Sequence, residues 1–243
     1  MTTSTTKTHA IVLLSGGLDS TAAALWARRH YEVVRALAFG YGQSHRDAEL
    51  AASERAAKRI GIPWMSLELA DAFLYTGGVA NGKPGKAPPQ GKDENGVSLA
   101  NTPARNNAFI ALASVRAGAW FPGQHVDVVI GSHVDDEDAF PDCRPDFVAK
   151  AGEAGSLALR GVCGFGTVAP WSGKKKSYCL SFFSGDEPSL AILRDSVSCY
   201  AGTRCGECDA CEQRRVAFVE AGLDDGVSGP ERMCGGDPSR ARA

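Results

Sequence analysis

Short apolar runs alternate with longer segments of helical periodicity along the first two thirds of the chain. The apolar runs have the length of buried strands, whereas the Ala-rich segments between them have the length of helices. The predicted strands are 9–14, 32–39, 63–69 and 126–131. The predicted helices are 20–29, 44–61, 104–119 and one that begins at 146. This order predicts an α/β, Rossmann-like fold, with a parallel sheet that carries helices on both faces.

Two stretches interrupt the alternation. Residues 75–101 are rich in Gly and Pro and predict a long loop or lid, and residues 133–145 predict a polar loop. Beyond residue 168 the pattern weakens, and 181–187 has loop composition. We therefore expect a flexible N-terminus, a nucleotide-binding domain, a cysteine-rich subdomain and a mobile tail. Their predicted bounds are 1–8, 9–195, 196–222 and 223–243.

Composition narrows the class of protein. The 243 residues are 44% hydrophobic and 22% charged, with a formal net charge of −2, so the strongly basic balance of many nucleic-acid-binding proteins is absent. The polar N-terminal residues do not resemble a signal peptide, and no apolar run approaches the ~18–20 residues of a membrane span. These features predict a cytoplasmic protein, in which the 8 cysteines are thiols or metal ligands.

The first predicted strand runs directly into the stretch Ser-Gly-Gly-Leu-Asp-Ser-Thr. Two glycines allow a tight turn, and the N–H groups of such a turn and of the following helix favour a phosphate. Asp19 would repel phosphate unless it held a cation such as Mg²⁺. The alternative is a plain turn with Asp19 or Ser20 as helix cap. The candidate nucleotide-binding residues here are Leu13, Leu14, Ser15, Gly16, Gly17, Leu18, Asp19, Ser20 and Thr21.

Four cysteines lie within thirteen residues: Cys199, Cys205, Cys208 and Cys211. Closely spaced thiolates in glycine-containing turns are typical ligands of a structural Zn²⁺. An iron–sulfur cluster is the alternative, but the Cys-x3-Cys-Pro continuation of bacterial ferredoxins is missing. We therefore predict a closed zinc site that takes no part in the reaction.

The loop at residues 15–20 resembles the PP-loop of the ATP pyrophosphatase superfamily. Members of that superfamily cleave ATP between the α and β phosphates, and transfer AMP to a carboxyl or carbonyl oxygen. Further stretches resemble one branch, the QueC family of queuosine and deazapurine biosynthesis. These stretches are 39–46 (FGYGQSHR), 103–106 (PARN), 139–147 (AFPDCRPDF) and 198–200 (SCY). The resemblance extends over roughly residues 11–222.

The resemblance implies a reaction and its participants. ATP would adenylate 7-carboxy-7-deazaguanine, ammonia would displace AMP, and a second ATP would convert the amide to 7-cyano-7-deazaguanine. ATP, Mg²⁺ and Zn²⁺ are the implied cofactors, and a homodimer is an additional expectation. Asp19, Ser20, Arg105 and Lys176 would be catalytic, while Phe39 and Tyr41 would extend the nucleotide site. The implied substrate-binding residues are Asn106, Asp135, Asp142 and Arg144.

Three alternatives remain open at this point. A related enzyme could stop at the amide or act on another carboxylate, because residues 177–198 depart from the family's pattern. An RNA-modifying enzyme is weakly disfavoured by the charge balance. The third alternative is a non-catalytic zinc-ribbon protein that binds a partner.

Overall fold

The computed structural model describes residues 8–73, 77–81 and 88–226. Five parallel strands form one sheet in the order β3-β2-β1-β4-β5. The strands are β1 (His9–Leu13), β2 (Val33–Gly40), β3 (Trp64–Glu68), β4 (His125–Val129) and β5 (Gly164–Val168). The order of the strands reverses beside β1, which pairs with β2 on one edge and with β4 on the other. In open sheets of this kind, ligands bind at the carboxyl ends of the strands beside such a reversal.

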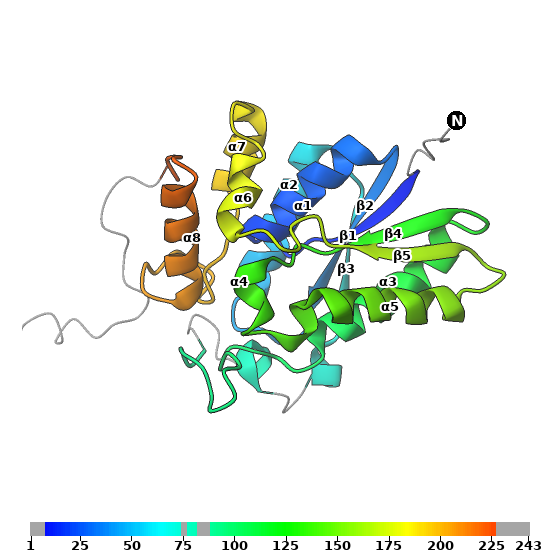
Figure 1. Ribbon diagram of the computed structural model, residues 1–243, viewed down its shortest axis with the longest axis horizontal. Helices are drawn as coiled ribbons and strands as arrows, with labels where there is room; N and C mark the ends of the chain where they lie inside the picture. The colour runs from blue at the N-terminus through cyan, green and yellow to red at the C-terminus, as the bar shows by residue number, and fades with distance from the viewer. Residues whose placement is uncertain (1–7, 74–76, 82–87, 227–243) are drawn as a thin grey trace, which may run out of the picture.

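Helices cover both faces of the sheet (Figure 1). The α-helices are α1 (Leu18–His30), α2 (Arg46–Ile60), α3 (Arg105–Trp120), α4 (Val134–Glu137), α5 (Pro145–Ala158), α6 (Lys176–Ser181), α7 (Glu187–Arg194) and α8 (Asp209–Glu220). The short 3₁₀ helices are η1 (Ala70–Phe73), η2 (Gly78–Asn81) and η3 (Pro141–Cys143). Helices α1, α2, α6 and α7 lie on one side of the sheet and α3 and α5 on the other (Figure 1). The α/β fold with a parallel sheet is therefore confirmed.

Two apolar cores lie on the two faces of the sheet. One contains alternate β1 residues, such as Ala10 and Val12, with the inner faces of α1 and α2 and parts of α6, α7 and α8. The other contains Ile11 and Leu13 with α3 and α5. The alternation follows from the strand period of two, and burial on both sides explains the unbroken apolar run at the start of the chain.

Several details differ from the sequence-based expectation. Strand β5 was not predicted, because two of its five residues, Gly164 and Gly166, are glycines that dilute the apolar signal. The loop predicted at 133–145 contains α4 and η3, and α7 begins within the stretch predicted as a loop. Pro188 lies in the first turn of α7, where a missing N–H costs nothing. Residues 74–76 and 82–87 of the predicted lid region lie outside the described residues, as do most of the terminal segments.

Within the described ranges, no helix is long and apolar enough to cross a membrane.

Candidate functional site

A pocket opens at the carboxyl ends of β1, β2 and β4. Its lining comes from segments that are far apart in the sequence, from Leu13 in β1 to Gln213 in α8. Twelve of the lining residues were predicted from the sequence to bind nucleotide or substrate or to act in catalysis. The predicted residues on the lining are Leu13, Leu14, Ser15, Gly17, Leu18, Asp19, Ser20, Phe39, Tyr41, Arg105, Asn106 and Lys176. The structure therefore brings most of the predicted residues to one place.

The loop between β1 and α1 has no space for side chains at its turn. Gly16 has a φ of +85°, and a Cβ there would lie 2.5 Å from the backbone nitrogen of Ser53 in α2. Gly17 is the N-cap residue of α1, and no side chain caps the helix. The alternative, in which Asp19 or Ser20 caps α1, does not occur in the structure: the Ser20 hydroxyl instead donates to the Gly17 carbonyl oxygen at 3.1 Å. The N–H groups of the first turn stay available to an anion.

Hydroxyl groups fix the shape of this loop. The Ser15 and Ser20 hydroxyl oxygens lie 2.9 Å apart, and the Gly17 N–H donates to the Ser15 hydroxyl at 3.3 Å. On the other side, the Ser53 hydroxyl donates to the Leu14 carbonyl oxygen at 2.7 Å. These contacts hold the turn in one conformation, as a backbone anion site requires.

A buried cluster of charged groups lies beside the loop. The Lys176 ammonium donates to Asp19 at 2.5 Å, and Nε2 of His133 lies 3.4 Å from Asp19 and 3.3 Å from Asp136. Lys176 is the first residue of α6, and its own backbone N–H donates to Asp135 at 2.8 Å. Asp135 therefore orients α6 from outside the pocket, while the Asp136 carboxylate lies on the pocket lining.

The charges in this cluster support one another. Burial alone would raise the pKa of Asp19, but the positive charges of Lys176 and His133 outweigh it and hold that pKa below the usual value. Burial would lower the pKa of Lys176, and the Asp19 and Asp136 carboxylates raise it instead. His133 follows the same pattern, with a raised pKa that results mainly from Asp19. For Asp136, burial prevails and raises the pKa.

A second polar group lies at the start of α3. The Asp142 carboxylate accepts from the Asn106 backbone N–H at 2.8 Å and so caps this helix from a distance. Ala104, at the N-cap, has a left-handed φ of 57°, a conformation that an alanine rarely adopts. Arg105 then points to Tyr41, to whose hydroxyl its guanidinium donates at 3.2 Å. Asp142 thus positions residues of the lining without belonging to it.

The remaining predicted residues lie off the lining. Arg144 donates to the Glu137 carbonyl oxygen at 2.9 Å on an exposed side of the pocket. Thr21 is fully buried in α1, and Gly16 faces α2. Cys143 lines the pocket, and burial raises the pKa of its thiol, which agrees with a packing role rather than a nucleophile.

Sequence reasoning missed several lining residues. Asp136 is one of four consecutive acidic residues, at 135–138, and no feature of the sequence distinguishes it from the others. Phe109 and Phe140 cannot be told apart from core residues by sequence. Ser198 and Tyr200 belong to a stretch that resembles the QueC family. The resemblance singled out this stretch, but it predicted no role for either residue. His133 also contacts the catalytic candidates Asp19 and Lys176, although a lone histidine in a sequence is more often structural.

The four clustered cysteines form a compact sulfur group. The Sγ atoms of Cys199 and Cys205 are 3.5 Å apart, those of Cys205 and Cys211 3.9 Å, and those of Cys199 and Cys208 4.0 Å. A tetrahedral Zn²⁺ with Zn–S bonds of about 2.3 Å places its sulfurs about 3.8 Å apart. A disulfide requires about 2.05 Å. All four cysteines are buried, so the group fits a closed structural metal site.

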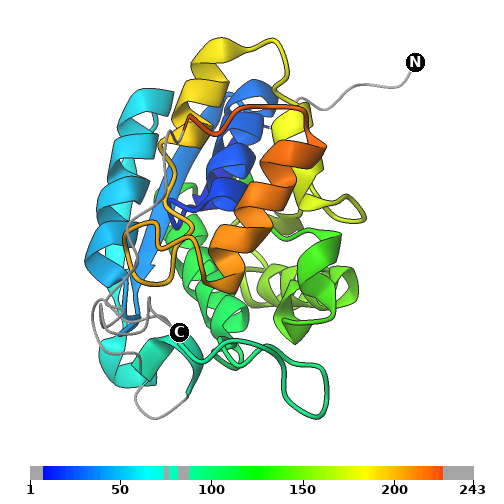
Figure 2. The ribbon, with the colours of Figure 1, turned by 90° about the vertical axis from the view of Figure 1, so that its left-hand side faces the viewer.

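The loop that carries the first cysteines, residues 199–208 before α8 (the cysteine loop), also contributes to the pocket. Tyr200 directly follows Cys199 and lines the pocket, and its carbonyl oxygen accepts from the Ser44 hydroxyl at 3.0 Å. In Figure 2, the loop that precedes α8 lies in front of the carboxyl ends of the strands, beside α2. Its Gly202 approaches Ala48 of α2 so closely that an added Cβ would lie 3.1 Å from the Ala48 Cβ. The metal site and the pocket are therefore neighbours.

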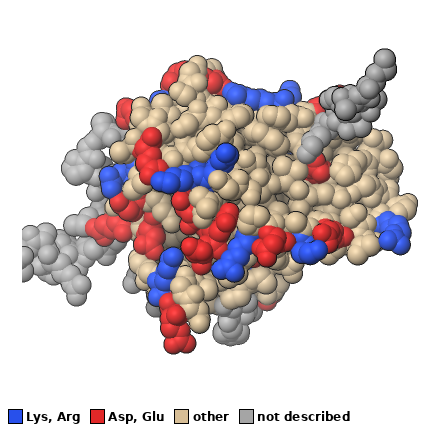
Figure 3. Space-filling view, in the orientation of Figure 1, with Lys and Arg blue, Asp and Glu red and all other residues tan. Residues whose placement is uncertain are grey.

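Charges of both signs occur on the face shown in Figure 3, and acidic side chains gather over the region of α4. Three of the four residues of α4 are acidic, namely Asp135, Asp136 and Glu137. An acidic surface beside the pocket repels a polyanion such as RNA.

Comparisons with known proteins agree with this geometry. Residues 9–222 match the family described as "Queuosine biosynthesis protein QueC". A 7-cyano-7-deazaguanine synthase from Legionella pneumophila (strain Paris) is 36% identical over 225 residues, which cover 89% of this chain and 94% of the relative. The protein of that name from Stutzerimonas stutzeri is 35% identical and covers 89% and 96%. Among solved structures, NMN synthetase from Francisella tularensis gives a TM-score of 0.45 at 15% identity, covering 93% of this chain and 81% of that one.

Proposed function

Because the chain belongs to the QueC family of queuosine biosynthesis proteins, we propose that it makes 7-cyano-7-deazaguanine from 7-carboxy-7-deazaguanine, ammonia and ATP. The observation that carries the proposal is the uncapped loop of residues 15–20, which opens into a pocket containing Lys176 and Arg105. A triphosphate needs such backbone donors and cations, and a flat heterocycle suits the aromatic side chains of Tyr41 and Phe109.

The proposed reaction has two activations. The carboxylate oxygen attacks the α-phosphate of ATP, pyrophosphate leaves, and ammonia then displaces AMP to give the amide. In the second round the amide oxygen attacks the α-phosphate of another ATP and pyrophosphate leaves again. Loss of AMP and of the protons on the amide nitrogen then leaves the nitrile. A free carboxylate is a poor electrophile, and adenylation supplies a leaving group in each round.

The residues of the pocket have distinct proposed roles. The N–H groups in the first turn of α1, at Leu18 and Asp19, would bind the phosphates, and Lys176 would neutralise the charge of the departing pyrophosphate. Arg105 would bind the acid or its phosphate, since a guanidinium matches both in a bidentate manner. Asp135, Asp142 and Arg144 would act through α6, α3 and the neighbouring loop, because they lie off the lining.

The acidic side chains fit a magnesium ion. Asp19 Oδ1 is buried and accepts no hydrogen bond from the described residues, and Asp136 offers a second carboxylate on the lining. Carboxylate oxygens are the ligands that Mg²⁺ prefers, together with phosphates. Asp19 and Asp136 would hold the ion, which would supply charge neutralisation to the phosphates. Cys199, Cys205, Cys208 and Cys211 would hold Zn²⁺, which would shape the fold.

Product analysis tests the proposal. The purified protein is incubated with 7-carboxy-7-deazaguanine, ATP, Mg²⁺ and ammonium, and the products are identified by mass spectrometry. We expect the nitrile with AMP and pyrophosphate from the unchanged protein and from Lys175→Met, whose side chain is exposed beside the site. Asp19→Asn should lose AMP formation. If the amide is the only product, the enzyme stops after the first activation. If no AMP forms at all, the proposal is overturned.

A further inference from the structure

Segment 195–198, between α7 and the cysteine loop, crosses directly over the PP-loop. The Val197 backbone N–H donates to the Gly16 carbonyl oxygen at 2.9 Å, and a Cβ at Gly17 would lie 3.8 Å from the Val197 carbonyl oxygen. Val197 and Ser198 line the pocket together with Ser15, Gly17 and Asp19. The segment therefore faces the same space as the proposed phosphate-binding groups.

The Ser198 hydroxyl is available to a ligand. Its oxygen is buried and has no hydrogen-bond partner among the described residues. Most buried polar atoms in folded proteins have a partner, so an unpaired hydroxyl on a pocket lining indicates that a ligand completes it. This observation is independent of the backbone contact between segment 195–198 and the PP-loop.

Arg214 of α8 holds segment 195–198 in place. Its side chain is only 3% exposed. One guanidinium nitrogen donates to the Ser196 carbonyl oxygen at 3.1 Å and to the Ser196 hydroxyl at 2.7 Å. The other terminal nitrogen donates to the carbonyl oxygens of Leu193 at 3.3 Å and Arg194 at 3.0 Å. The planar guanidinium of Arg214 thus fixes both the end of α7 and the segment that follows it.

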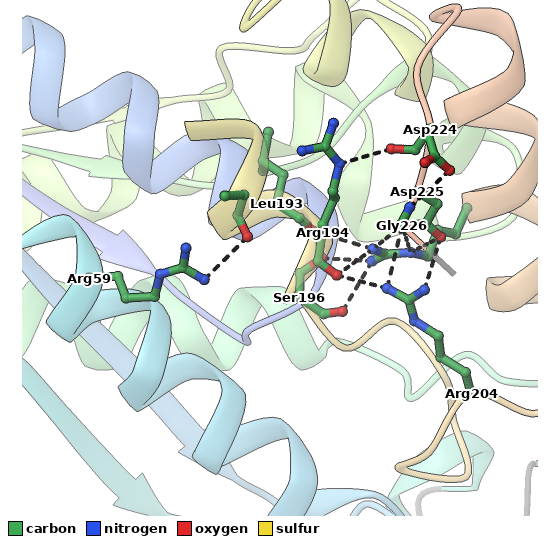
Figure 4. Close-up of polar contacts among 10 residues, drawn as sticks. Arg59, Leu193, Arg194, Ser196, Arg204, Asp224, Asp225 and Gly226 are labelled. Atoms are coloured by element: carbon green, nitrogen blue, oxygen red, sulfur yellow. Dashed lines mark hydrogen bonds and ion pairs between the residues drawn. The ribbon is translucent and has the colours of Figure 1, made fainter. Parts of the chain in front are cut away.

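Asp225, labelled in Figure 4, supplies the negative charge that balances the Arg214 guanidinium. Arg214 Nε donates to its Oδ2 at 2.9 Å, and Arg204 Nη1 lies 3.2 Å from the same oxygen. Arg204 also donates to the Arg194 carbonyl oxygen at 2.7 Å. Removing the partner of a buried guanidinium leaves its charge uncompensated and destabilises the contacts that it makes. The segment after α8, at residues 223–226, is therefore tied to the PP-loop through Arg214 and segment 195–198.

We propose that segment 195–198 is part of the ATP-binding site and that Asp225 is a positioning residue for it, acting through Arg214. The inference rests on the proposed function, because ATP is the ligand it concerns. The Ser198 hydroxyl would donate a hydrogen bond to the nucleotide. Asp225 would affect the affinity for ATP without contacting the nucleotide.

Direct binding of ATP in the presence of Mg²⁺, measured by calorimetry without the second substrate, tests the inference. We expect Ser198→Ala to weaken binding about fivefold, the value of one hydrogen bond, with an unchanged melting temperature, because the hydroxyl has no internal partner to lose. We expect Asp225→Asn to weaken binding roughly five- to tenfold, and Asp225→Glu to restore part of it.

Arg215→Gln is the matched control. Arg215 is adjacent to Arg214 on α8, but its ion pair with Glu212 is exposed, so its loss should leave ATP affinity unchanged. In turnover assays, the Asp225 variant should raise KM for ATP more than it lowers kcat. If Ser198→Ala and Asp225→Asn both bind ATP as the unchanged protein does, the inference is overturned while the proposed function stands. If the unchanged protein fails to bind ATP, both are overturned.

Discussion

Replacing Lys176 with methionine tests the energetic role of the buried ion pair at the centre of the pocket. The Lys176 side chain is 10% exposed and that of Asp19 22%, and the two are 2.5 Å apart. Removing one partner of a buried pair costs about 3–5 kcal/mol, because the other charge remains uncompensated. Since His133 stays 3.4 Å from Asp19, we expect the lower end of this range, about 3 kcal/mol.

Urea unfolding monitored by circular dichroism measures this change. With a slope of about 3 kcal/mol per molar urea, the midpoint of Lys176→Met should fall by about 1 M at an unchanged slope. Lys175→Met is the matched control: its ammonium is exposed and pairs with Glu220 at 3.2 Å. Exposed pairs contribute about 0–1 kcal/mol, so its midpoint should shift by no more than about 0.3 M.

A double variant measures the interaction energy between Lys176 and Asp19 separately from the other contacts of the two side chains. Adding Asp19→Asn to Lys176→Met removes the uncompensated carboxylate, so the combined loss should be smaller than the sum of the single losses by about 1–3 kcal/mol. Equal midpoints for Lys176→Met and Lys175→Met, or strictly additive losses, would refute the reasoning that the pair is buried and coupled.

Two further predictions concern pH and metal. Asp19 raises the pKa of His133 above its usual 6.5, so the stability that His133 contributes is complete below about pH 6.5 and is lost as pH rises through the raised pKa. The difference in free energy of unfolding between the unchanged protein and His133→Gln should therefore narrow as the pH rises above about 6.5, and a difference that stays constant with pH would contradict this prediction. Cys208→Ser should lose the bound zinc, measured by elemental analysis, and melt several degrees lower. The control Cys163→Ser, outside the sulfur group, should keep the metal; a full zinc content in Cys208→Ser would contradict the site.

Much of the fold and the centre of the site could be predicted from local sequence patterns. The loop at residues 15–20 combines a buried strand, two glycines and a helix start within ten residues, so its structure depends on neighbours in the chain. The cysteine group is recognisable for the same reason. The loop's conformation nevertheless needs Ser53 of α2, and no local pattern predicts that contact.

The rest of the site depends on contacts between distant segments. Asp135 and Asp136 are adjacent and chemically equal in the sequence, and only the start of α6 directs Asp135 to a backbone N–H and leaves Asp136 on the pocket lining. Asp225 belongs to a stretch with the composition of a tail, although it pairs with Arg214 and Arg204. Strand β5 is too rich in glycine to be predicted, and its pairing with β4 defines it.

The position of β1 at the centre of the sheet also concerns how the chain is made. β1 is synthesised well before its pairing partner β4, which begins only at His125, and the pocket is complete only when Gln213 has been added. At a synthesis rate of roughly 5–20 residues per second, the β4 edge of the apolar strand β1 stays unpaired for several seconds. The nascent chain therefore depends on α1, α2 and β2 to protect β1, and the pocket can bind a ligand only after α8 has been made.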